Sequence, residues 1–150
     1  MRSAFFMGTA LAAIIGTATP AAAAGWEWAQ FGMTRDEVVK ASGGKAVPGM
    51  NGTLQLKEPF RFADFDFDAL AFGFNDAGKL DTVTLSSEKQ QFYLIEQALA
   101  AQFGQPLTET EGDYPARVFV DKTKGNAITL RYAKINGTTM ITYKPVENRF

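Results

Sequence analysis

Three aspartates at alternate positions are the side chains of this sequence whose spacing best suits metal binding or acid–base catalysis. Asp64, Asp66 and Asp68 are separated by single phenylalanines, so an extended strand would place the three carboxylates on one face, about 6.5 to 7 Å apart. Such a row could bind calcium, because acids at alternate positions open the calcium loop of an EF-hand. That loop also needs Gly at its sixth position and Glu at its twelfth, where this chain has Ala69 and Asn75. The row is therefore a candidate metal site whose loop is incomplete. We favour the interpretation that the three aspartates form the solvated face of an edge strand.

The same carboxylates set the limits of any catalysis. Two of them have the separation, about 5 to 9.5 Å, that glycosidases use for their paired acids, although nothing in the sequence places them in a cleft. The chain has no His and no Cys, which excludes Ser-His-Asp and Cys-His nucleophiles and zinc held by imidazole or thiolate. We therefore expect a protein that binds rather than catalyses, and no cofactor.

The first 24 residues have the layout of a secretory signal peptide. Arg2 precedes an apolar stretch over residues 4–15, and Ala22 and Ala24 form an Ala-x-Ala exit. The apolar stretch is shorter than the roughly 20 residues that span a bilayer. We predict a signal peptide over residues 1–24 and a single α+β domain over residues 25–150. This domain would be periplasmic or secreted, from a bacterium, and not inserted in a membrane.

Charge excludes one class of partner. Removing residues 1–24 removes one base and no acid, so the net charge changes from −1 to −2. A chain so close to neutrality has no field that would attract nucleic acid. We therefore expect a partner other than nucleic acid.

The secondary structure begins with a helix that follows a capping box. Thr34 and Glu37 have the spacing at which each side chain satisfies the other residue's backbone N–H. Met33 and Val38 are placed to form a hydrophobic staple across this start. The pattern predicts a helix from Thr34 to the glycines at 43–44.

A hairpin follows in the middle of the chain. Large apolar residues alternate with small ones over residues 69–74, and a second apolar run follows the turn. Pairing Phe72 with Val83 puts Leu70 opposite Leu85, so both strands bury the same face.

A second helix and three further strands complete the domain. Residues 92–103 carry apolar residues at helical spacing after a cap from Ser87 and Gln90. The Asn-Gly pair at 136–137 predicts a tight hairpin that places Tyr132 opposite Ile141. A looser turn over residues 122–126 would then place Val120 opposite Ile128.

These elements predict an α+β fold. We expect an antiparallel sheet of about six strands with two helices packed on one face, in the order α-β-β-β-α-β-β-β.

The outward face of the last strands is a candidate protein-binding surface. The predicted pairing places Phe119 opposite Thr129 and diagonal to Arg131, and Tyr114 in the preceding loop would extend the patch. Exposed aromatic and Arg side chains are the types that anchor interfaces. The alternative is that a second layer or a loop covers Phe119.

Two motifs resemble known families. The stretch QFGMTRDEVVKASG at residues 30–43 resembles the helix-opening motif of the β-lactamase inhibitory protein family, and its Gly-Met-Thr core is similar to small lipoproteins of the outer-membrane protein assembly machine. The stretch FGFNDAGKL at residues 72–80 resembles the sheet hairpin of the same structural group. The resemblance implies a helical layer on an antiparallel sheet and a role in binding other proteins. The chain has one copy of the motif and no Cys, whereas the inhibitory proteins repeat the motif and carry disulfides and the lipoproteins carry a lipidated cysteine.

Together these features predict an exported module that binds another envelope or secreted protein, as an inhibitor or an accessory factor. One alternative is a protein that binds a small ligand or metal ion, with Asp64, Asp66 and Asp68 as the ion candidates. Another is a carboxylate-dependent hydrolase that acts on envelope polymers.

Overall fold

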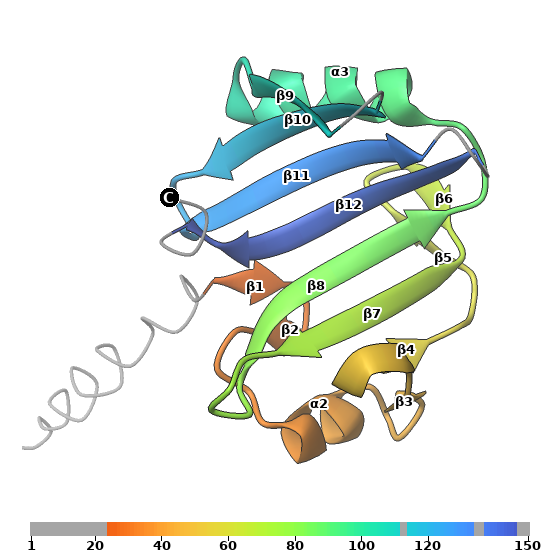
Figure 1. Ribbon diagram of the computed structural model, residues 1–150, viewed down its shortest axis with the longest axis vertical. Coiled ribbons are helices and arrows are strands. Elements are labelled where there is room, and N and C mark those ends of the chain that lie inside the picture. The colour runs from red at the N-terminus through yellow and green to blue at the C-terminus, as the bar shows by residue number, and fades with distance from the viewer. Residues whose placement is uncertain (1–23, 112–113, 134–136, 147–150) are drawn as a thin grey trace, which may run out of the picture.

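The centre of the fold is a main sheet of eight antiparallel strands (Figure 1). The computed structural model describes residues 24–111, 114–133 and 137–146, so the predicted signal peptide, apart from Ala24, lies outside the described residues. Neighbouring strands follow the order β3-β4-β7-β8-β12-β11-β10-β9. The bounds are β3 Val47–Pro48, β4 Leu54–Leu56, β7 Ala69–Phe74, β8 Leu80–Ser87, β9 Leu107–Glu111, β10 Tyr114–Asp121, β11 Asn126–Ala133 and β12 Thr138–Pro145.

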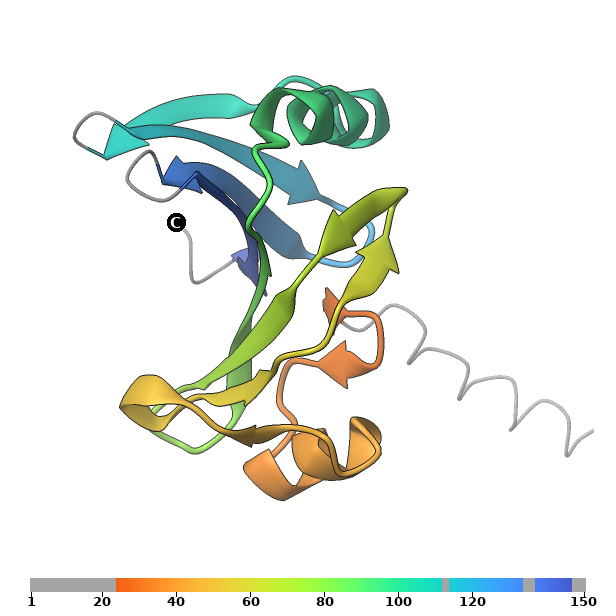
Figure 2. The same ribbon diagram turned by 90° about the vertical axis from the view of Figure 1, so that its right-hand side faces the viewer.

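Shorter elements lie against one face of the main sheet. Figure 2 shows both helices and two small ribbons of strand on the same side of it. Neither helix of the described chain is long and apolar enough to cross a membrane. These elements are β1 Gly25–Trp26, β2 Ala29–Gln30, α2 Arg35–Ala41, β5 Phe60–Phe62, β6 Phe65–Phe67 and α3 Phe92–Phe103. A 3-10 turn at Met50–Gly52 connects β3 to β4.

The predicted fold class is wrong. In place of about six strands in the order α-β-β-β-α-β-β-β, the described chain is mostly antiparallel β, with eight strands in its main sheet and a two-stranded ribbon before α2. The strands that the prediction missed are short, and several contain only two or three residues. Alternation cannot be recognised over so few positions, because an apolar/polar pattern needs about four residues to be distinguished from a loop.

The start of α2 is confirmed. The backbone N–H of Thr34 donates to Glu37 Oε1 at 2.8 Å, and the Glu37 N–H donates to Thr34 Oγ1 at 3.2 Å. The hydrogen bond from the Thr34 backbone lowers the pKa of the Glu37 carboxyl below its ordinary value. Val38 is fully buried, and Met33 packs against the same core. The capping box therefore fixes where the helix begins and which side it buries.

The central hairpin and the second helix also follow the sequence pattern. Phe72 pairs with Val83 and Leu70 with Leu85. The α3 helix packs on β10 and β11 and buries its apolar stripe. Its predicted cap is wrong, because Gln91 occupies the cap position and Ser87 instead bonds to the loop before the helix.

Four phenylalanines cover the middle of the same sheet face. In the β5–β6 ribbon Phe60 pairs with Phe67 and Phe62 with Phe65, so all four rings lie on one side of the ribbon. The rings of Phe60 and Phe67 stack at 5.4 Å. This aromatic ribbon, together with the two helices, closes the core.

The turn between β10 and β11 is set by an aspartate. Asp121 pairs with Asn126, and its carboxylate accepts N–H groups from Thr123 at 3.0 Å and Lys124 at 3.2 Å. The turn then closes through Gly125, whose φ of 73° suits glycine. Such short-range bonding by Asp is typical of tight turns.

This turn shifts the register by one residue from the prediction. Phe119, rather than Val120, lies opposite Ile128. A shift of one residue moves every side chain of a strand to the other face of the sheet. Phe119 is therefore in the core, 1% exposed, and not on the outward face.

The β11–β12 pairing differs from the prediction by two residues. Ala133 pairs with Thr138, which leaves four residues in the connection and brings Tyr132 opposite Thr139 rather than Ile141. A two-residue shift preserves the face, because the side-chain period of a strand is two. The predicted face assignments of β11 and β12 therefore hold.

Asn126 ties the start of the described chain to the main sheet. Its Oδ1 accepts the N–H of Gly25 at 3.0 Å, and its Nδ2 donates to the Gly25 carbonyl at 2.9 Å. Asn126 is buried, so both backbone groups of Gly25 are satisfied away from water. This pair of bonds positions β1 beside the carboxy-terminal strands.

The register of β10 predicts the effect of shortening Phe119. We expect Phe119→Ala to lower the free energy of unfolding by about 3–5 kcal/mol, the range for a large aromatic residue removed from a packed core. Tyr93→Ala is the matched control, because Tyr93 is 59% exposed on α3 and should change stability by less than about 0.5 kcal/mol. Urea unfolding measures both, and equal small losses would contradict the register.

The Asn126 bonds predict a second loss of stability. Asn126→Ala leaves two buried backbone groups of Gly25 without partners, at about 1–3 kcal/mol each, so we expect a loss of at least ~2 kcal/mol in urea unfolding. Asn75→Ala is the control, because the Asn75 side chain also accepts two backbone N–H groups but is exposed. A loss no larger than that of the control would show that β1 is not held by these bonds.

Candidate functional site

The predicted patch of Tyr114, Phe119 and Arg131 does not form one surface. Phe119 lies in the core on the α3 side of the sheet, because the register shift moves it from the predicted outward face to the opposite face. Arg131 lies on the opposite face, opposite Ala116 and Met140. Tyr114 begins β10, and its side chain lies outside the described part of the structure. Of the three, Arg131 is the residue found on the predicted outward face.

A continuous surface of small side chains lies on that outward face. Side chains that pair across β7, β8 and β12 share a face, and here Thr84 lies opposite both Ala71 and Thr142. All members of this surface are half-buried. We call this surface the open face, and it comprises Ala69, Ala71, Gly73, Thr82, Thr84, Ser86, Met140 and Thr142.

The open face is uncharged and curved. Figure 2 shows that the main sheet bends inward on this side, away from the two helices and the β5–β6 ribbon. The hydroxyls of Thr84 and Thr142 lie 3.3 Å apart at its centre. Thr129, 8% exposed, and Arg131 continue the surface onto β11. The arrangement offers hydroxyl groups among side chains that are mostly small.

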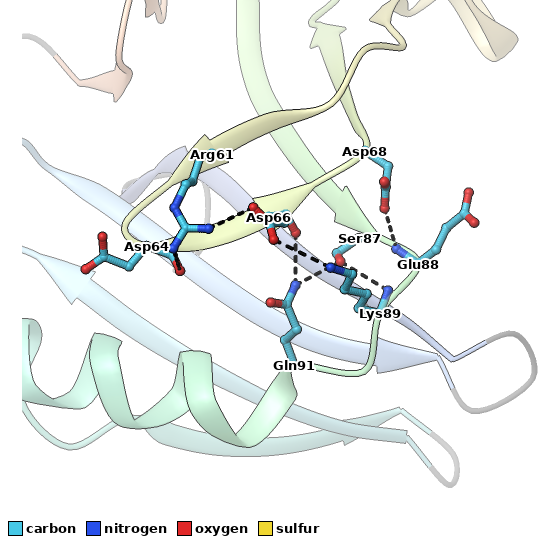
Figure 3. Close-up of polar contacts among 8 residues, drawn as sticks. All are labelled: Arg61, Asp64, Asp66, Asp68, Ser87, Glu88, Lys89 and Gln91. Atoms are coloured by element: carbon cyan, nitrogen blue, oxygen red, sulfur yellow. Dashed lines mark hydrogen bonds and ion pairs between the residues drawn. The ribbon is translucent and has the colours of Figure 1, made fainter.

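The three aspartates are spread over a turn, a strand and a connection (Figure 3). Asp64 lies in the β5–β6 turn with a φ of 69°, Asp66 lies in β6, and Asp68 lies between β6 and β7. They therefore do not form the single row that the sequence predicted. Across the described chain, no group of three or more acidic side chains is placed to share a metal ion.

Asp66 and Asp68 instead form ion pairs and hydrogen bonds with neighbouring residues. Asp66 bonds to Arg61 at 2.9 Å and to Lys89 at 3.5 Å, and Asp68 accepts the N–H of Glu88 at 2.7 Å. Figure 3 shows these contacts joining the β5–β6 ribbon to the loop that leads into α3. Because the ion pairs are exposed, each contributes little stability, about 0–1 kcal/mol. Their role is to orient the ribbon over the sheet.

A cluster of aromatic rings surrounds Trp26 on the covered side of the sheet. The ring centroid of Trp26 lies 6.1 Å from Trp28, 5.9 Å from Phe60 and 5.6 Å from Phe62, all edge to face. These four residues line a hollow of about 310 Å³. This site was not predicted from the sequence, although the Phe-x-Phe spacing of β5 places two of its rings on one face of a strand. Trp26 and Trp28 come together differently, because Trp28 lies in the turn between β1 and β2.

Trp26 carries a polar atom without a partner. Its side chain is 5% exposed, and its indole Nε1–H meets no acceptor among the described residues. A buried Trp usually finds a hydrogen-bond partner, and a donor left unpaired costs about 1–3 kcal/mol. Such an atom in a native fold requires an explanation.

A second hollow of about 290 Å³ lies on the other side of the β1–β2 turn. Trp26 also lines this space, together with Phe103, Asn126 and Tyr143. Burial raises the pKa of the Tyr143 phenol well above its ordinary value, and the nearby charges of Glu27 and Asp121 add to the effect. Tyr143 is thus held in its neutral form.

Comparisons with known proteins assign no family. No family model matches the sequence, and no curated protein matches it. Among solved structures, the chain is similar to a DUF4309 family protein, YjgB, from Bacillus subtilis. The identity is 14%, the match covers 75% of this chain and 78% of that chain, and the TM-score is 0.49.

The raised pKa of Tyr143 predicts a loss of stability in base. Above pH about 10 the unfolded chain loses the phenol proton while the folded protein keeps it, so the free energy of unfolding falls as pH rises, by up to about 1.4 kcal/mol per pH unit. Tyr143→Phe removes this proton, and its unfolding free energy should fall less steeply. Urea unfolding across this pH range compares the two slopes, and parallel curves would contradict the assignment.

Proposed function

We propose that this chain is an exported module that binds another protein of the bacterial envelope or secreted space, without catalysis. The observation that carries the proposal is the open face, a curved sheet surface that the described helices and ribbons leave uncovered. Function of this kind also agrees with the role that the sequence resemblance implies.

The chemistry of the open face favours a protein as the partner. The cores of protein interfaces are depleted in charged residues, and the open face has no charged member. Its small side chains let a partner's larger side chains approach the strands, and the hydroxyls of Thr84 and Thr142 can then bond to polar groups. A nucleic acid would require a basic surface, which the open face lacks.

The hydrolase alternative receives no support from the acid cluster. The side chains of Asp66 and Asp68 are engaged in ion pairs and backbone hydrogen bonds. The small-ligand alternative is favoured by a separate observation, the unpartnered indole of Trp26, and is developed below.

The proposal predicts that filling the open face removes binding. We expect Thr142→Arg to weaken capture of the partner by at least about tenfold, because a long charged side chain at the centre of an uncharged interface must be desolvated. Thr142→Ser, which keeps the hydroxyl, should bind as the natural chain does. The measurement is affinity capture from the envelope fraction of the source cells, quantified for the three chains after unfolding curves show that each is folded.

Photo-crosslinking locates the surface directly. A photoreactive residue close in size to methionine, placed at Met140 of the open face, should form an adduct that Thr142→Arg abolishes, whereas the same residue at Lys40, exposed on α2, should form none. Adducts of equal yield from both positions, or no adduct from Met140, would overturn the proposal.

A further inference from the structure

The hollow of about 310 Å³ beside Trp26, which we call the aromatic hollow, is a candidate binding site separate from the open face. It lies on the covered side of the main sheet, between the β1–β2 turn, the end of α2 and β5, and has a volume of about 310 Å³. This volume is at the lower end of the range for small-molecule sites, about 300–1,000 Å³. Its walls are the rings of Trp26, Trp28, Phe60 and Phe62, and the last three are only half-buried. The hollow therefore presents apolar ring surface to an occupant of modest size.

The unpartnered indole of Trp26 specifies part of the occupant. Three rings contact this side chain edge to face and leave its Nε1–H buried without an acceptor in the described chain. A hydrocarbon would fill the space but leave the N–H unpaired, so the occupant must carry an acceptor oxygen or nitrogen beside an apolar surface. Pockets that combine aromatic walls with few polar groups fix a ligand's orientation in this way.

The rim specifies the charge of the occupant. Two carboxylates and two cations border the hollow, namely Glu27, Glu58, Lys45 and Arg61. Lys45 and Glu58 pair at 3.1 Å, and Arg61 pairs with Asp66 at 2.9 Å. Because the two negative and two positive charges balance, the rim provides no net electrostatic attraction for an anion or a cation. They do provide both donors and acceptors for hydroxyl groups.

We propose that the aromatic hollow binds a neutral sugar ring. The C–H face of the ring packs on Trp28 and Phe60, a ring or hydroxyl oxygen accepts the Trp26 indole N–H, and outer hydroxyls bond to the Lys45–Glu58 pair. This site does not depend on the protein-binding proposal, because the hollow and the open face lie on opposite sides of the main sheet. Either can fail without the other.

The experiment follows the indole N–H of Trp26 by nitrogen–proton NMR of the folded domain. The chain has two tryptophans, and Trp28→Phe assigns the two indole signals. Glucose and N-acetylglucosamine are the neutral probes, and glucuronate and glucosamine are the charged comparators, each titrated into the millimolar range. We expect a saturable shift of the Trp26 indole signal with a neutral probe, and a weaker or absent response to the charged sugars.

Matched variants decide which hollow is used. Trp28 lines only the aromatic hollow, and Phe103 lines the second hollow beside Trp26 but not the first. Trp28→Ala should weaken the neutral sugar by at least about tenfold, whereas Phe103→Ala should leave its affinity unchanged, with unfolding curves showing that both variants are folded.

Three results would overturn the inference. One is an indole signal that no neutral sugar shifts. Another is tighter binding of a charged sugar than of its neutral counterpart. The last is loss of binding in Phe103→Ala with retention in Trp28→Ala, which would move the ligand to the second hollow.

Discussion

The main sheet has to bury one apolar face, and the elements available to cover it are short. α3 packs over β10 and β11 at one end, and Val38 of α2 enters the core with the first strands. The space between is filled by rings, above all those of Phe60 and Phe67. One aromatic side chain buries about 150–250 Å², so a three-residue strand can provide the cover that a longer helix would otherwise supply. Hollows form where these small pieces meet, while the other face stays open.

Two buried polar side chains where the β1–β2 ribbon meets the main sheet differ in their hydrogen bonding. The amide of Asn126 is matched at both of its ends by Gly25, which lets a two-residue strand hold its place on the sheet. The indole of Trp26, the next residue, has no such match in the described chain. The turn that follows holds Glu27 at a φ of 47°, a conformation that side chains other than Gly, Asn and Asp seldom adopt. The β1–β2 ribbon is thus held to the main sheet by hydrogen bonds at Gly25. Next to it, Trp26 has an unpaired donor among the described residues, and Glu27 is exposed and has a strained backbone.

Local signals in the sequence carried the predictions that the structure confirms. The capping box of Thr34 and the alternation around Phe72 each act within a few residues, so the helix start and the hairpin register follow from them. The position of Phe119 depended on how many residues the next turn holds, and Asp121 made that number differ by one from the prediction. The aromatic site could not be derived, because its rings come from two short ribbons whose docking depends on tertiary contacts. Pattern alone predicts partners within a hairpin better than partners between separate ribbons.

The bonds between Gly25 and Asn126 join residues 101 positions apart. Contacts of such long sequence separation form late, because the entropy of closing the intervening loop must be overcome first. Strands β10 to β12 pair through neighbouring hairpins and can assemble without the amino-terminal ribbon. The first strand of the described chain, β1, is therefore expected to dock in one of the last steps of folding, after β11 has formed and placed Asn126.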